Sequence, residues 1–227
     1  MNSIWLIFIL VMVLSYLIQS VLNSRFEKYS KVPLSSGMTG AEVALKMLHD
    51  HGIMDVTVEH VGGHLTDHYN PQNKTLNLSD DVFYGRSVAA AAVAAHECGH
   101  AVQHRFAYGP LMLRSALVPV VSFANNWVQW VLLAGIIFIN VFPHLIWVGI
   151  GLFAMTTLFS LVTLPVEVNA SSRAVEWLDK VGIVDAQTKP MAKDALKWAA
   201  YTYVIAAIGS LATLLYYIAI ATGGSRR

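Results

Sequence analysis

The stretch AAVAAHECGHAVQH, residues 91–104, places two histidines four positions apart with a glutamate directly after the first. In a helix, positions four apart lie on one face, offset by about 40°, so His96 and His100 project side by side. Both imidazoles can then reach one zinc ion, with Zn–N distances of about 2.0–2.1 Å. Glu97 lies beside them, where a carboxylate can take a proton without binding the metal. The pattern predicts a zinc site with Glu97 as general base.

The residues before the motif favour a helix. The run SVAAAAVAA, residues 87–95, is an excellent helix former, and we predict a helix over residues 86–105. Gly99 within it costs about 1 kcal/mol relative to alanine, which suits a place where another backbone approaches closely. Cys98 points about 200° away from His96 and is expected to be a small buried residue. The alternative is a pair of surface histidines with an unrelated glutamate.

Composition indicates a membrane protein. The 227 residues are 56% hydrophobic and 13% charged, whereas soluble domains have about 25% charged residues. A helix needs about 20 apolar residues to cross a bilayer. Four stretches satisfy this requirement: residues 4–22, 122–142, 145–164 and 199–222. We interpret the first as an uncleaved anchor, because it is too long for a signal-peptide core.

The charged residues favour one orientation in the membrane. With four crossings, the polar sections 25–115 and 167–198 lie on the same face. They hold 13 of the 15 lysines and arginines, the others being Arg226 and Arg227. By the positive-inside bias, this face is cytoplasmic and both termini are outside. We therefore expect a multi-pass protein of the cell membrane with its active site on the cytoplasmic side.

The predicted fold class is an α-helical integral membrane protein with about four transmembrane helices and a small α+β, zincin-like domain of the gluzincin type. Its expected divisions are an anchor at 1–24, the catalytic domain at 25–115, a transmembrane hairpin at 116–166, a second catalytic-side segment at 167–198, and a C-terminal helix with its tail at 199–227.

Short elements can be predicted within the polar section. Thr39 and Glu42 have capping-box spacing and begin a helix of about 12 residues. The runs VTVEHV (56–61) and KTLNLS (74–79) alternate like strands, with NPQN (70–73) as a turn between them. The run at 74–79 is either an edge strand that pairs with an extended substrate or an ordinary strand of the sheet.

A catalytic zinc needs three protein ligands and an open position. Phe106 occupies the place of the third histidine of metzincins, which excludes that class. His104 is about 80° from His96 and would be strained as a ligand. Glu167 follows Pro165 at the exit of the third span, where a carboxylate so near hydrocarbon requires a partner. A zinc ion is one such partner, and an interfacial lysine or arginine is the alternative. Glu167 is our candidate third ligand.

Two segments carry a resemblance to a known family. AAHECGHAVQH, followed about 70 residues later by LPVEVNASSRA, resembles the YugP-type membrane zinc metallopeptidases. It is more distantly similar to the HtpX-like and CAAX-prenyl-protease membrane metallopeptidases, and the resemblance covers nearly the whole chain. It implies that His96, His100 and Glu167 are metal ligands and that Glu97 is the general base.

The chain departs from the HtpX-like pattern at two places. Ser171 stands where that group has aspartate, and Val168-Asn169 stands where a more acidic pair is expected. Ser171 lies on the same helix face as Glu167 and can hydrogen-bond a ligand.

The predicted function is a membrane-embedded zinc-dependent metalloendopeptidase with one Zn²⁺ per chain. Its substrate is a polypeptide near the membrane surface, because Arg86 and Arg105 bracket the motif helix and keep it out of the bilayer. A net charge of +1 gives no field that would attract nucleic acid. The alternatives are a zinc hydrolase of a non-peptide substrate and a non-catalytic membrane scaffold with a structural zinc, in which His104 would fill the fourth position.

Overall fold

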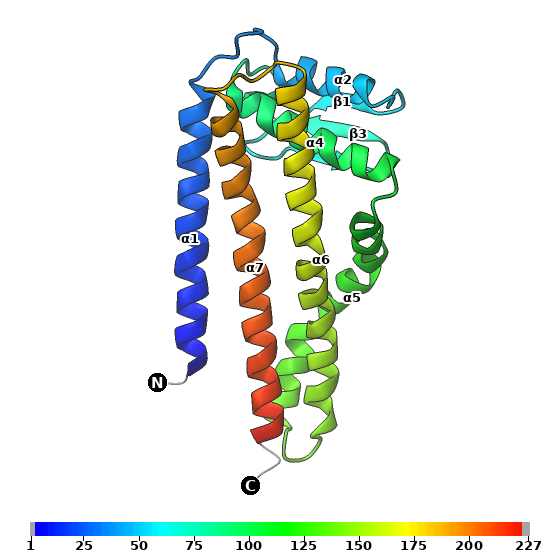
Figure 1. The fold of residues 1–227 in the computed structure, drawn as a ribbon. Helices are drawn as coiled ribbons and strands as arrows, with labels where there is room; N and C mark the ends of the chain where they lie inside the picture. Colours follow the sequence, from blue (N-terminus) through cyan, green and yellow to red (C-terminus); the bar gives the residue numbers. More distant parts are fainter. Residues whose placement is uncertain (1–2, 224–227) are drawn as a thin grey trace. The chain divides into compact units, whose positions relative to one another are not determined.

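The computed structural model describes residues 3–223. The outermost residues of the predicted anchor and tail, among them Arg226 and Arg227, lie outside the described residues. In chain order the elements are α1 (Ser3–Ser30), α2 (Gly40–Asp50), β1 (Thr57–His60), β2 (His68–Asn70), β3 (Thr75–Leu78), α3 (Asp80–Phe83), α4 (Val88–Arg105), α5 (Gly109–Ile137), α6 (His144–Lys180) and α7 (Lys189–Gly223) (Figure 1).

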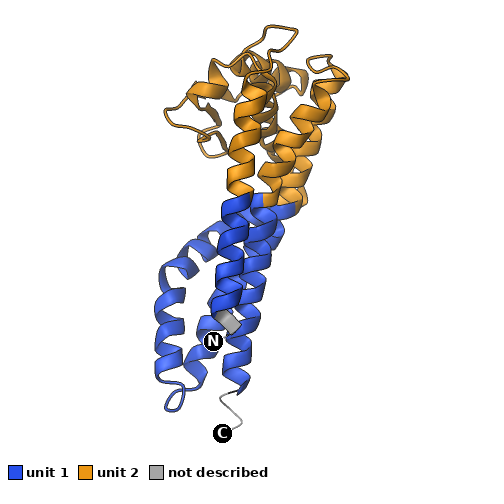
Figure 2. Ribbon diagram, turned by 90° about the vertical axis from the view of Figure 1, so that its left-hand side faces the viewer, with its two compact units in different colours: residues 1–17, 112–164, 202–227 blue, residues 18–111, 165–201 orange. Residues whose placement is uncertain are grey.

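The chain divides into two compact units (Figure 2). Unit 1 comprises residues 1–17, 112–164 and 202–227, and unit 2 comprises residues 18–111 and 165–201. The small sheet and the HECGH motif both belong to unit 2.

Four described helices are long and apolar enough to cross a membrane, as the sequence predicted. They are Trp5–Ser30, Gly109–Ile137, His144–Lys180 and Lys189–Gly223. The second ends at Ile137 and not at residue 142, because the chain turns there and Val141 N donates a hydrogen bond to Phe138 O. Within unit 1, α5 and α6 pack through a small apolar core that includes Leu132 and Ile146.

In unit 2, the predicted capping box at the start of α2 is confirmed. The Thr39 side chain accepts a hydrogen bond from Glu42 N at 3.1 Å, and the Glu42 carboxylate accepts one from Thr39 N at 2.7 Å. These two bonds satisfy amides that the first helical turn leaves without partners. The helix runs for 11 residues, close to the expected length.

The sheet of unit 2 has the strand order β1-β3-β2, with β1 parallel and β2 antiparallel to β3. The strands predicted at 56–61 and 74–79 are present, but β2 was missed because three residues are too few to show an alternation. The NPQN turn therefore joins β2 to β3. The edge-strand interpretation of residues 74–79 is wrong, because β3 is the central strand and all four of its residues are buried.

The motif helix α4 lies in the core of unit 2, where it packs against α2, α3 and the sheet. It begins at Val88, two residues later than predicted, because Ser87 is extended and its side chain caps the helix by accepting from Ala90 N. Alanines fill its buried faces. Their small side chains allow neighbouring elements to approach closely on all sides, including residues 165–180 of α6, whose Ala174 and Leu178 join the same core.

Candidate metal centre

Helix α4 places the three polar residues of the motif together. The rings of His96 and His100 pack edge to face with centroids 4.8 Å apart, as their spacing predicted. Ligand atoms of His96, Glu97 and His100 all lie within 4.8 Å of one another. His96 and Glu97 are each only 9% exposed, so the group is largely removed from water.

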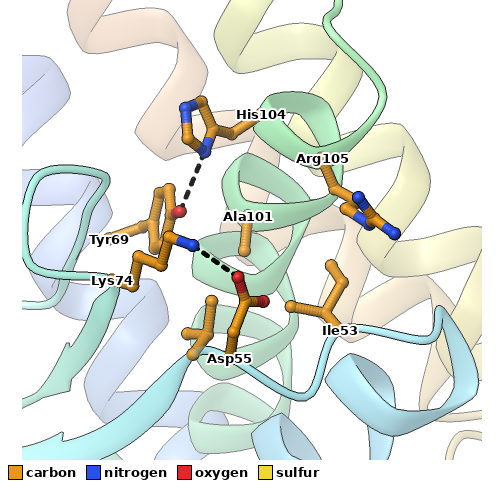
Figure 3. A pocket seen from close by; sticks show the side chains of 8 residues that line it. Ile53, Asp55, Tyr69, Lys74, Ala101, His104 and Arg105 are labelled. Carbon is orange, nitrogen blue, oxygen red and sulfur yellow. Dashed lines mark hydrogen bonds and ion pairs between the residues drawn. The ribbon is translucent and has the colours of Figure 1, made fainter.

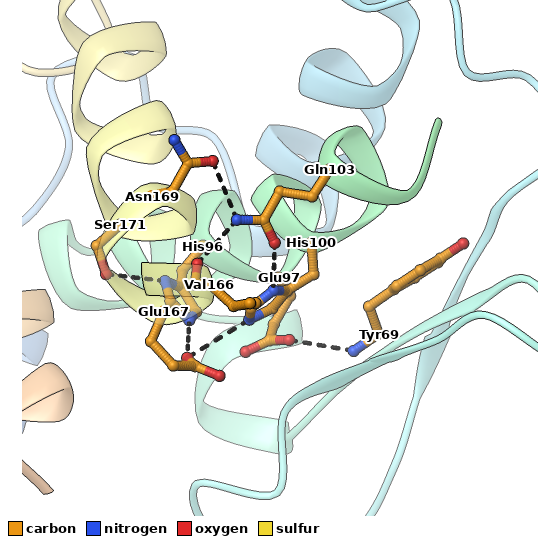
Figure 4. Close-up of polar contacts among 9 residues, drawn as sticks. All are labelled: Tyr69, His96, Glu97, His100, Gln103, Val166, Glu167, Asn169 and Ser171. Atoms are coloured by element: carbon orange, nitrogen blue, oxygen red, sulfur yellow. Dashed lines mark hydrogen bonds and ion pairs between the residues drawn. The ribbon is translucent and has the colours of Figure 1, made fainter. Parts of the chain in front are cut away.

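Helix α6 brings Glu167 to both histidines (Figure 4). One carboxylate oxygen, Oε2, lies 3.3 Å from Nε2 of His96 and 3.6 Å from Nε2 of His100. Glu167 is only 3% exposed. Two tetrahedral zinc ligands, each about 2.0–2.1 Å from the metal, lie about 3.4 Å from each other. The spacing of these three atoms therefore fits one zinc ion.

The other ring nitrogen of each histidine also has a partner (Figure 4). His100 Nδ1 lies 3.1 Å from Gln103 Oε1, and His96 Nδ1 lies 3.1 Å from Ser171 Oγ. An amide oxygen only accepts, so the Nδ1 of His100 carries the proton. The Ser171 hydroxyl can accept from His96 in the same way. Each ring therefore presents Nε2 toward Glu167, and a neutral imidazole held in this way can bind a metal through that atom.

Gln103 joins the two helices of the site. Its side chain is fully buried, and Nε2 donates to Val166 O at 2.8 Å and to Asn169 Oδ1 at 3.0 Å. Arg173 donates from Nε to the same Asn169 oxygen at 2.7 Å. Gln103 was not predicted as a site residue, although a polar residue three positions after His100 in an alanine-rich helix was an available signal.

Strand β2 lies against the general-base candidate. Tyr69 N donates to Glu97 Oε2 at 3.1 Å, and the Tyr69 hydroxyl lies 3.1 Å from His104 Nδ1. His104 is therefore hydrogen-bonded to β2. Among the described residues, the clustered ligand atoms are those of His96, Glu97 and His100, and His104 lies outside this group. Neither Tyr69 as a site residue nor its strand was predicted from the sequence.

The charges of the site favour a cation between its carboxylates. Burial lowers the pKa of His100, but the hydrogen bond to the Glu167 carboxylate and the charges of the nearby carboxylates outweigh this and leave the pKa raised. Burial raises the pKa of Glu97, and the two histidines oppose it only in part. Buried carboxylates that attract protons in this way also attract a metal cation.

Cys98 is buried, as predicted. Its Sγ donates to Ala44 O at 3.4 Å, on the α2 side of the helix, and burial raises the pKa of the thiol well above its usual range. A thiol with so little tendency to ionise is a poor ligand and nucleophile.

Apolar helices long enough to span a membrane, together with a buried His–Glu–His group, define an α-helical membrane protein with a candidate metal site. Residues 4–222 match the family described as "Putative neutral zinc metallopeptidase", and the chain belongs to this family. It is 46% identical over 211 residues to the "Putative membrane protease YugP" of Bacillus subtilis (strain 168), covering 93% of each chain. No solved structure matches the chain. The resemblance noted from the motif is thereby confirmed.

Proposed function

We propose that the protein is a membrane-embedded zinc metalloendopeptidase of the gluzincin type, with a zincin-like domain on the cytoplasmic side. His96, His100 and Glu167 hold one Zn²⁺ per chain, and Glu97 is the general base. The observation that carries the proposal is the convergence of Glu167 Oε2 on the Nε2 atoms of both histidines, at 3.3 and 3.6 Å, in a buried group with Glu97 beside it.

A zinc ion held by His96, His100 and Glu167 would supply a water whose pKa is lowered to about 7 and a Lewis acid for the scissile carbonyl. Glu97 takes the proton of the attacking water and later delivers it to the leaving amine. Its buried carboxyl has a raised pKa, which makes it a stronger base than a free glutamate. The bond from Tyr69 N fixes one carboxylate oxygen and leaves the other, Oε1, to exchange the proton.

The substrate pairs with β2 and not with the strand at 74–79. Strand β2 is hydrogen-bonded to β3 on one side only, so its other side is an edge of the sheet. At Tyr69 the backbone N–H faces away from β3 and toward Glu97. An extended polypeptide added at this edge by backbone pairing would pass the catalytic carboxylate. This favours an endopeptidase acting on unfolded or loop segments near the membrane surface.

We also propose that the functional segments of the chain end at residues 24, 115, 166 and 198. Segments 25–115 and 167–198 supply the catalytic residues. The remaining segments anchor them to the lipid bilayer.

Metal content and cleavage of an unfolded protein such as casein, measured together, test the function. Wild type should hold one zinc per chain and cleave casein. Glu167→Ala should lose the zinc, whereas Glu97→Gln should keep it and lose cleavage. Glu176→Gln is the matched control, because Glu176 is an exposed glutamate on the same helix.

The same measurement separates the rival functions. Zinc that is retained in all variants, with cleavage in none, would favour a structural zinc in a membrane scaffold. Zinc that is lost with Glu167→Ala, without cleavage of any polypeptide, would favour a hydrolase of a non-peptide bond.

A further inference from the structure

A pocket of about 190 Å³ opens between β2, the end of α4 and the chain that follows α2 (Figure 3). Pockets for drug-sized ligands measure about 300–1,000 Å³, so this one suits a single side chain or a chain end. It is lined by Ile53, Asp55, Val56, Tyr69, Lys74, Ala101, His104 and Arg105.

Tyr69 connects the pocket to the site. Its backbone N–H holds the Glu97 carboxylate, while its side chain lines the pocket and its hydroxyl contacts His104 Nδ1. Side chains alternate between the two faces of a strand. A peptide paired with the free edge of β2 would therefore direct one side chain near its scissile bond toward the face that carries the Tyr69 ring.

The pocket carries a net positive charge from its lysine, arginine and aspartate. Lys74 Nζ is 2.6 Å from Asp55 Oδ2, so these two charges neutralise each other. The Lys74 ammonium holds the pKa of Asp55 below its usual range, which keeps the carboxylate ionised. Arg105 is exposed and, within the described part of the chain, has no carboxylate within ion-pair distance, although its charge also helps to lower the pKa of Asp55. In Figure 3, Lys74 and Arg105 line opposite sides of the pocket.

We propose that this pocket is a substrate-recognition site for a carboxylate, with Arg105 as its principal partner. The inference rests on the proposed peptidase function and adds its specificity. The guanidinium presents a planar fork of N–H donors that fits a carboxylate, and Lys74 adds a second cation that Asp55 partly occupies. The carboxylate belongs either to an aspartate or glutamate side chain or to the C-terminus of the substrate.

Cleavage of matched peptides tests the proposal. A cleavable sequence is varied with Glu, Gln or Lys at each position around the scissile bond, and each peptide is made with a free and an amidated C-terminus. For wild type we expect kcat/KM to be about five-fold higher for Glu than for Gln at one position, the upper end of the effect of an exposed ion pair. If the C-terminus of the substrate is the ligand, amidation should instead lower kcat/KM by a similar factor at a given distance from the scissile bond.

Two variants should change this ratio in opposite directions. Arg105→Gln should bring the Glu/Gln ratio close to one. Asp55→Asn should increase it, because a competing carboxylate is removed. Lys193→Gln, which removes an exposed cation of α7 in the same unit, is the control and should leave the ratio unchanged.

The pocket proposal and the peptidase function fail in different ways. Cleavage that shows neither a preference for Glu at any position nor an effect of amidation, or an effect that persists in Arg105→Gln, would overturn the pocket. Peptides that no form of the protein cleaves would overturn the peptidase. In that case, fluorescence anisotropy of labelled Glu and Gln peptides on Glu97→Gln still decides the pocket, because equal affinities would exclude it and tighter binding of Glu would support it.

Discussion

A Cβ atom placed on Gly99 would lie 2.8 Å from the carbonyl oxygen of Ala170, because α4 and α6 touch there backbone to backbone. The glycine sits between Glu97 and His100, and Ala170 follows Glu167 by one helical turn. The glycine in the motif predicted such a close approach. It brings Glu167 of α6 to the two histidines of α4.

Gly99→Ala is therefore expected to destabilise the protein and to weaken zinc binding. Helix propensity alone would favour alanine by about 1 kcal/mol, but forced overpacking costs about 1–3 kcal/mol. The neighbouring atoms are backbone and cannot rotate away. Thermal unfolding in detergent should show a lower Tm, and competition with a chromophoric chelator should show about a ten-fold loss of zinc affinity.

Gly151→Ala is the control for this prediction, since its added Cβ meets no atom within 4 Å. It should leave Tm unchanged or slightly higher. Equal behaviour of the two variants would show that the contact between α4 and α6 does not position the site.

Ser171→Ala removes the hydrogen-bond partner of His96 Nδ1, which lies 3.1 Å away. Loss of such an outer contact typically costs 10–100-fold in metal affinity, and we expect a decrease in this range. Ser171→Asp, which restores the residue of the HtpX-like pattern, should bind zinc at least as tightly as wild type. The adjacent and exposed Ser172 provides the control Ser172→Ala. An unchanged zinc affinity in Ser171→Ala would mean that the backbone alone orients His96.

Gln103→Leu keeps the side-chain size but removes three hydrogen bonds of a buried residue, to His100, Val166 and Asn169. The groups left unsatisfied cost about 1–3 kcal/mol each, so both Tm and zinc affinity should fall. Gln103→Glu should lose stability but bind zinc better than Gln103→Leu, because its carboxylate still accepts from His100 Nδ1. Indistinguishable zinc affinities in the two variants would contradict the orienting role of Oε1.

Removal of the metal should lower the stability of wild type. A ligand that binds only the folded state, present at 100 times its Kd, stabilises that state by about 2.7 kcal/mol. A chelator such as EDTA should therefore decrease Tm, and added zinc should restore it. In Glu167→Ala the same treatment should have a much smaller effect. A Tm of wild type that does not respond to chelator or to zinc would argue against a metal centre.

Local features of the sequence predicted local features of the fold. The four apolar runs, the capping box of α2 and the pairing of His96 with His100 depend on residues within one or two turns of each other. Hydropathy and helical periodicity report such neighbours directly. For the same reason, β2 was too short to be recognised from its three residues. The turn at 70–73 was therefore predicted to follow the strand at 56–61, whereas it joins β2 to β3.

The sequence by itself determined the membrane helices, the motif helix and the residue types that can bind zinc. Only the tertiary structure decided what surrounds them. Gln103 bonds to α6, Tyr69 holds Glu97, and β3 is central in the sheet and not at its edge. These contacts join residues 28 or more positions apart, and the pairing of such residues follows from how whole elements pack, which no local pattern of side chains encodes.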